Sequence, residues 1–101
     1  MYGVLSTVAA PVELYDALHA EIGRRSKGQV DGLLAHIGRA TPDGFEVIEV
    51  WESREHFERY TRDVVGVVMA ELAPGPVPTA GQAPVEFDVR GLVVPSARIY
   101  V

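Results

Sequence analysis

Residues 32–57 constrain the fold of this chain more than any other segment, because they hold two strand-like runs joined by a tight turn. The runs cover 32–41 and 44–51, and each carries apolar residues on both of its faces. A single layer of helices covers only one face of a sheet, so the second face needs another cover. The pattern therefore predicts an α+β domain that forms a homodimer through its sheet faces.

The turn between these runs contains Pro42 and Gly44, which favour a β-hairpin because Pro presets φ and Gly tolerates positive φ. Two registers fit the sequence. A three-residue loop with a bulge shifts every pair by one position relative to a two-residue turn. We favour the two-residue turn, because it matches opposite charges and like apolar groups. Its pairs are Arg39 with Glu46, Ile37 with Ile48, His36 with Glu49 and Leu34 with Trp51.

The segments around the hairpin complete a β-α-β-β-α-β order. Residues 2–8 alternate in part and predict a strand, and a helix with apolar residues every four positions follows Pro11 and stops at Gly28. Ser53 is a suitable N-cap for a second helix that extends to Leu72. Residues 85–94 predict a fourth strand, and 99–101 a further short one. This order is the ferredoxin-like plan, an antiparallel four-stranded sheet with strands 1 and 3 central.

Composition excludes several classes of function. The chain has 101 residues, which predicts one domain over 1–101, and a net charge of −5, which gives no electrostatic footprint for nucleic acid or an anionic membrane. It contains no Cys, so it has no thiol catalysis and no disulfide. No apolar run reaches about 18 residues, and the first ten residues lack a basic region. We therefore expect a cytoplasmic protein.

His36 is the strongest candidate for chemistry, because it lies within an apolar strand with Glu49 directly across from it in the favoured register. A carboxylate beside an imidazole fixes the tautomer and raises basicity, as a general base requires. The alternative is a structural polar pair in the sheet or the dimer interface, since buried polar groups usually find partners.

Aromatic residues near the hairpin are candidates for a ligand-binding wall. Trp51 stacks on a flat substrate or fills the core at the strand end, and Phe45 on the same face is more typical of a core residue. Tyr60 donates a hydrogen bond into a cavity or packs with its hydroxyl at the surface, and Tyr15 has the same two interpretations. The predicted substrate-binding residues are Trp51, Tyr60 and Phe45.

No cofactor or metal site is predicted. His19 and His56 lie on separate helices, and metal sites normally need three or four convergent ligands. The chain has no phosphate-binding glycine motif and no nucleophile elbow. The Pro-rich segment 73–84 is a connector or a lid over a cavity.

Several motifs in 32–57 resemble those of the dimeric α+β barrel superfamily, and of its small antibiotic-biosynthesis-monooxygenase-like proteins in particular. The resemblance covers about residues 2–94 and is carried by Gly32 to His36, Gly44 and Phe45, Val50 to Ser53, and Phe57. It implies a homodimer with sheets packed face to face and a cavity between each sheet and its helices. It also implies activities such as cofactor-free oxygenation of phenols, quinol oxygenation or haem degradation.

Only some of the functional residues of this superfamily have a matching residue in the chain. Trp51 matches the Trp at the end of the third strand in the superfamily. His36 matches a His that is frequent in the uncharacterised members, so the resemblance assigns it no role. The haem-degrading members use an Asn on the first strand and a His on the second helix. This chain has no Asn, and the positions near Thr61 are not His, so the resemblance does not extend to haem degradation. Phe57 stands where the phenol oxygenases have a Tyr.

Three hypotheses for function follow. The first is a cofactor-independent monooxygenase acting on a small aromatic or quinone-like molecule, with His36 as the base and Glu49 as its orienting partner. The second is a non-catalytic barrel protein that binds a small apolar ligand in the same cavity. The third is a subunit whose role is assembly, with the cavity filled by Trp51, Phe45 and Tyr60.

Overall fold

A computed structural model describes residues 1–73 and 83–101, so most of segment 73–84, the predicted lid or connector, lies outside the described residues. The sheet strands are β1 (Tyr2–Val8), β2 (Leu33–Thr41), β3 (Gly44–Trp51) and β4 (Val85–Asp88). The helices are α1 (Val12–Ser26), α2 (Arg54–Tyr60), the π-helix η1 (Thr61–Val65) and α3 (Gly66–Leu72). The C-terminal elements are β5 (Val93–Val94), the 3-10 helix η2 (Pro95–Ala97) and β6 (Ile99–Tyr100).

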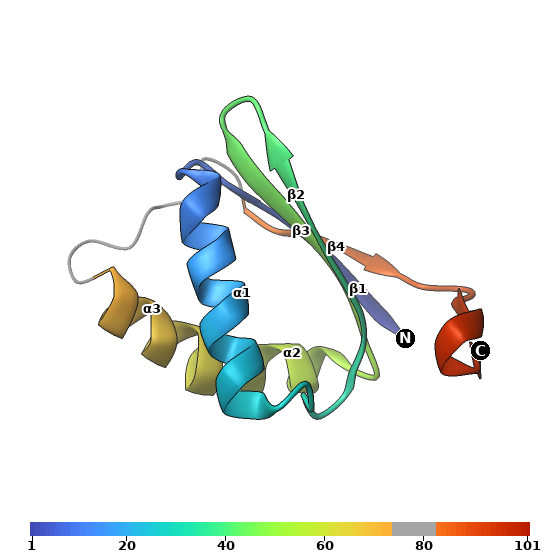
Figure 1. The fold of residues 1–101 in the computed structure, drawn as a ribbon. Coiled ribbons are helices and arrows are strands. Elements are labelled where there is room, and N and C mark those ends of the chain that lie inside the picture. The colour runs from blue at the N-terminus through green and yellow to red at the C-terminus, as the bar shows by residue number, and fades with distance from the viewer. Residues whose placement is uncertain (74–82) are drawn as a thin grey trace.

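The sheet has the order β2-β3-β1-β4, and every neighbouring pair is antiparallel. The helices lie on one face of this sheet, and the C-terminal elements project away from its end (Figure 1). The predicted ferredoxin-like plan with strands 1 and 3 central is therefore confirmed. Among the described residues, no helix is long and apolar enough to cross a membrane.

The hairpin has the two-residue turn that the charges favoured. Thr41 pairs with Gly44, Arg39 with Glu46, and His36 with Glu49. The prediction was wrong only at the open end of the hairpin, where Leu33 and not Leu34 faces Trp51. A β-bulge between Leu33 and Ala35 places an extra residue in β2, which shifts the register there.

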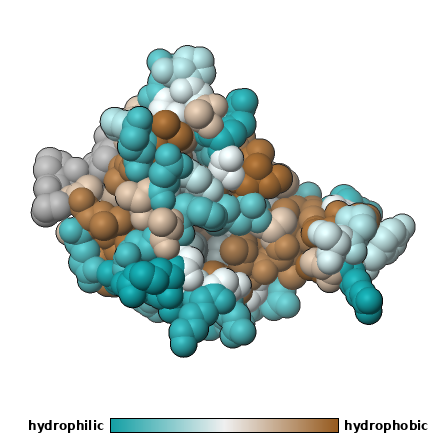
Figure 2. All heavy atoms as spheres, in the orientation of Figure 1, coloured by the Kyte–Doolittle hydropathy of each residue, from teal (hydrophilic) through white to brown (hydrophobic). Residues whose placement is uncertain are grey.

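The two faces of the sheet are both apolar, as the sequence indicated. Val4, Phe45 and Trp51 lie under the helices and are buried. On the opposite face, Ile37 is 58% exposed and Phe87 40% exposed. In Figure 2, hydrophobic surface extends from the middle of the molecule toward its C-terminal end. This face has no cover within the described part of the chain.

The second helix is interrupted, which the sequence did not predict. Ser53 caps α2 as expected, since its Oγ accepts a hydrogen bond from the backbone N–H of His56. The N–H of Gly66 then bonds to the carbonyl of Thr61, five residues earlier, and this widened turn separates α2 from α3. Such π-helical turns are rare and occur often at functional sites.

The predicted fourth strand is shorter than 85–94. β4 ends at Asp88, which pairs with Tyr2, the first residue of β1, and the N–H of Val89 bonds to the carbonyl of Met1. Val93 and Val94 instead pair with 99–100, which confirms the short strand expected in the tail. The first helix ends at Ser26, and Lys27 and Gly28 after it both have positive φ, so the predicted stop at Gly28 is confirmed.

Candidate active site

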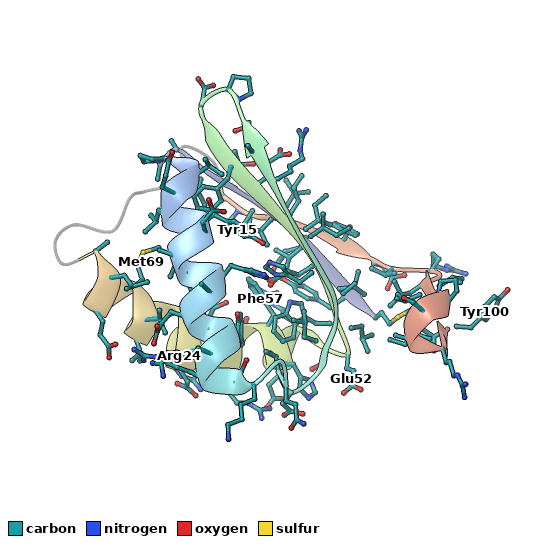
Figure 3. All side chains as sticks on the ribbon, viewed as in Figure 1. Tyr15, Arg24, Glu52, Phe57, Met69 and Tyr100 are labelled. Carbon is teal, nitrogen blue, oxygen red and sulfur yellow. The ribbon has the colours of Figure 1, made fainter. Side chains whose placement is uncertain are left out.

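A cavity of about 450 Å³ lies between the sheet and the helices. Strands β1, β2 and β3 form one wall, and α1, α2, η1 and α3 form the other. Most of the lining is apolar, and Figure 3 shows Tyr15 and Phe57 between the helices and the sheet. The apolar lining includes Val8, Leu18, Ile22, Phe45, Val47, Phe57, Val65 and Met69. The cavity expected from the sequence is therefore present.

One group of polar residues meets this cavity on the sheet side. His36 and Glu49 are directly opposite on β2 and β3, and His36 Nδ1 lies 2.8 Å from Glu49 Oε2. Glu49 is only 6% exposed, so its carboxylate depends on this partner. Both residues line the cavity. The pairing predicted from the hairpin register thus occurs at the wall of the cavity.

Tyr15 of α1 extends this pair across the cavity. Its hydroxyl oxygen lies 2.9 Å from Nε2 of His36 and 3.4 Å from Nδ1 of His19. The rings of Tyr15, His19 and His36 are near parallel, with interplanar angles of 12–21°. The sequence signal for the contact between Tyr15 and His19 is their i,i+4 spacing in the first helix, next to the apolar residues Leu18 and Ile22. Sequence reasoning had given Tyr15 no catalytic role.

The chemistry of the groups sets the direction of the hydrogen bonds. An ionised carboxylate only accepts, so the Nδ1 of His36 donates to Glu49. In the neutral imidazole, Nε2 is then the acceptor, and the Tyr15 hydroxyl donates to it. Burial, followed by the charges of Glu49 and Asp16, raises the pKa of Tyr15, so its hydroxyl keeps its proton at neutral pH. Both ring nitrogens of His36 are therefore engaged.

Gly38 makes room for this arrangement. It faces the helices two positions after His36, and a Cβ at this position would overlap the ring of Tyr15 at Cζ and the hydroxyl oxygen. The Tyr15 ring thus lies directly against the backbone of β2. This close approach needs a residue without a side chain at position 38.

The predicted aromatic residues lie together, but not all of them at the cavity surface. Phe45 lines the cavity, with its ring centroid 5.5 Å from that of Tyr15. Tyr60 also lines it, and burial, followed by the charges of Glu49 and Tyr15, raises the pKa of Tyr60 to about 12. Trp51 is 0% exposed and is not part of the lining.

Trp51 supports the cavity wall from behind. Its ring centroid lies 5.1 Å from that of Tyr60 and 6.1 Å from that of Phe57. Its buried Nε1 has no hydrogen-bond partner among the described residues. Of the two interpretations of Trp51, the structure agrees with the core residue at the strand end.

The remaining histidine lies apart from this site. His56 Nδ1 is 2.6 Å from Ser53 Oγ, and its ring packs on the backbone of Gly32. Within the described ranges, 1–73 and 83–101, no group of three or more His, Asp or Glu residues is placed to hold a metal ion.

Comparison with known proteins rests on structure. No family model matches the chain, and no curated protein matches it either. A mutant of MhuD with two manganese protoporphyrin IX molecules bound per active site matches with a TM-score of 0.55 and 21% identity. The match covers 92% of this chain and 96% of that one.

The chain has the fold of MhuD. The fold that the resemblance of residues 32–57 implied is therefore confirmed. A second structure, of the heme-degrader MhuD from Mycobacterium tuberculosis with two hemes bound in its active site, has a TM-score of 0.49 and 20% identity. It covers 93% of this chain and 99% of that one.

Proposed function

We propose that this protein is a monooxygenase that oxidises a small, flat aromatic or quinol-like hydroxyl compound with molecular oxygen and without a bound cofactor. The observation that carries this proposal is the hydrogen-bonded group Glu49, His36 and Tyr15 on the wall of an otherwise apolar cavity. Apolar walls suit a flat ring and dissolved oxygen, and the polar group provides a base for the hydroxyl.

The reaction begins with loss of the substrate hydroxyl proton to the base centred on His36. The resulting phenolate gives one electron to oxygen, and the two radicals join in a new carbon–oxygen bond para to the hydroxyl. The peroxide takes up the proton and then loses water as its O–O bond and the para C–H bond break. A phenol and one oxygen molecule thus give one quinone and one water. The carboxylate of Glu49 stabilises the imidazolium that exists between these steps.

Oxygen uptake in the presence of 1-naphthol tests this proposal. With ¹⁸O₂, one labelled atom is expected in the quinone and the other in water. His36→Ala should lower turnover by about 100-fold or more, as expected for loss of a general base. His56→Ala is the matched control, because His56 lies outside the cavity and should leave turnover unchanged. Unchanged turnover in His36→Ala would reject His36 as the base.

Non-catalytic binding of a flat ligand is the second candidate, and His19 is the observation that favours it. His19 lines the cavity, and only its Nδ1 makes a hydrogen bond within the described residues, so Nε2 is free to bind a ligand. The MhuD mutant of the same fold holds manganese porphyrins, which makes a metalloporphyrin the ligand class to test. Titration with haem should change the haem absorption spectrum, and His19→Ala should weaken this binding. Equal binding by His19→Ala would reject the histidine as a ligand.

We further propose that the protein is a homodimer through the sheet face opposite the helices. Large apolar side chains on this face, including Ile37, Val85 and Phe87, are 40–58% exposed in the single chain. Burial of such side chains in a second copy removes their apolar surface from water. An assembly protein with a filled cavity is the least supported hypothesis, because the cavity is open.

A further inference from the structure

We propose that Tyr15 is the catalytic residue that touches the substrate hydroxyl, and that Gly38 is its positioning residue. This inference rests on the proposed function and assigns the contact with substrate to a residue of α1 instead of to His36. The substrate class it implies is a compound with an ionisable aromatic or enolic hydroxyl.

The first argument is that His36 has no free ring nitrogen. Its Nδ1 is 2.8 Å from Glu49 and its Nε2 is 2.9 Å from the Tyr15 hydroxyl. A substrate hydroxyl reaches Nε2 only by displacing Tyr15, whereas the oxygen of Tyr15 is the next atom along the chain of hydrogen bonds. Glu49, His36 and Tyr15 therefore form a proton relay in which Tyr15 is the group nearest to the substrate.

The second argument is the direction of the relay. Because the carboxylate of Glu49 only accepts, its hydrogen bond fixes the proton of His36 on Nδ1 and leaves the Nε2 lone pair toward Tyr15. The proton on the Tyr15 oxygen then moves to Nε2 as the substrate O–H bond breaks and its proton moves to Tyr15. The electron pair stays on the substrate oxygen, and no oxidant or reductant takes part in this step. The buried Glu49 carboxylate offsets the new charge on His36.

The third argument is the packing of the Tyr15 ring. The ring has three aromatic neighbours, the rings of His19, His36 and Phe45, at centroid separations of 5.4–6.0 Å. On the strand side it lies against Gly38, where a methyl group would overlap it. These contacts hold the hydroxyl in place before substrate arrives, as a group that acts in proton transfer requires.

A nitrophenol tests the inference without any turnover, because its anion absorbs at longer wavelength than the neutral phenol. With the native protein, bound nitrophenol should be more ionised than free nitrophenol at the same pH. Tyr15→Phe keeps the ring but removes the hydroxyl, so it should abolish this spectral shift. Nitrophenol binding to this variant should weaken only about threefold to tenfold, as for one lost hydrogen bond.

Gly38→Ala is the second variant, and it leaves every group of the relay in the chain. It should displace the Tyr15 ring and reduce the spectral shift, so it carries the test if Tyr15→Phe does not fold. Gly91→Ala is the matched control, because a Cβ there meets only the Val101 carbonyl oxygen, at an ordinary 3.9 Å, and the shift should persist.

Two results of the nitrophenol test would overturn the inference. One is a native protein that binds nitrophenol without ionising it, and the other is a Tyr15→Phe variant that folds, binds and still ionises it. Oxygen uptake with 1-naphthol is measured separately in the native protein. Ionisation without oxygen uptake would reject the proposed oxygenase and retain the role of Tyr15. Uptake that is undiminished in Tyr15→Phe would retain the oxygenase and reject the role of Tyr15.

Discussion

Glu49 and His36 form a cross-strand pair in which the carboxylate is the more deeply buried partner. Their side chains are 8% and 23% exposed, respectively. An unpaired buried carboxylate is more costly than an unpaired, partly exposed imidazole. The pair is therefore asymmetric, and its two members should respond differently to removal.

The first prediction concerns the stability of this pair. His36→Ala should lower the free energy of unfolding by about 3 kcal/mol, because it leaves the Glu49 carboxylate without its partner. Glu49→Ala should cost less, about 1–2 kcal/mol, for one unpaired ring N–H. The double variant should cost about 1–3 kcal/mol less than the sum of the two. Urea unfolding of all four proteins measures this coupling, and strict additivity would show that the pair is not formed.

The second prediction concerns Trp51, which is completely buried but leaves its indole N–H unpaired. Trp51→Ala should destabilise the protein by about 3–5 kcal/mol through the cavity it creates. Trp51→Phe should cost well under half of that, because it keeps most of the ring and removes the unpaired polar group. Denaturant unfolding measures both. Equal losses in the two variants would indicate that the indole N–H has a partner in solution.

The third prediction is a loss of stability at alkaline pH. Burial raises the pKa of Tyr60 to about 12 in the folded protein, against about 10 in an unfolded chain. Between these values the unfolded state releases its proton first, so the free energy of unfolding falls as pH rises from 10 to 12. Burial and a hydrogen bond to Glu86 also raise the pKa of Tyr2 to about 12. Tyr2 therefore adds to the fall in the free energy of unfolding over the same pH range.

Unfolding measured at several pH values tests this slope. Tyr60→Phe should make the fall between pH 10 and 12 shallower, and the double variant with Tyr2→Phe should make it shallower still. Tyr100→Phe is the control, because this side chain is 83% exposed. A slope that is the same in native protein and in Tyr60→Phe would contradict the prediction.

The fourth prediction concerns the exposed face of the sheet. Ile37→Glu places a charge on the proposed dimer interface, where its burial is unfavourable. At micromolar concentration the native protein should sediment as a dimer and the Ile37→Glu variant as a monomer. Val67→Glu is the matched control, since Val67 is also exposed but lies on α3, on the helical side of the sheet. A native protein that sediments as a monomer would reject the homodimer.

The central hairpin could be predicted from sequence because its information is local. Arg39 and Glu46, and His36 and Glu49, fix the register through charge, and the Pro42 turn fixes the loop length. The bulge after Leu33 could not be predicted in this way, because it depends on how the first residues of β2 follow the loop that precedes this strand. The end of β4 at Asp88 depends on where its partner β1 begins, which is a contact between segments far apart in the sequence.

The candidate site was predicted only in part for the same reason. Glu49 and His36 are neighbours across one hairpin, so their contact follows from register. Tyr15 reaches His36 from a helix 21 positions earlier, and the angle at which α1 crosses the sheet decides that contact. The composition of the α1 stripe shows that Tyr15 faces the core, but not which strand residue it meets. The role of Gly38 likewise cannot be predicted from sequence, because it depends on the Tyr15 ring that packs against it in the fold.

The burial of Trp51 beside Tyr60 also gives this protein an internal optical signal. The chain has a single Trp, so its fluorescence arises from one site directly behind the cavity wall. An occupant of the cavity that shifts Tyr60 alters the surroundings of that fluorophore without touching it. Emission spectra can therefore report occupancy of the cavity by unlabelled compounds that do not absorb in the range of Trp fluorescence.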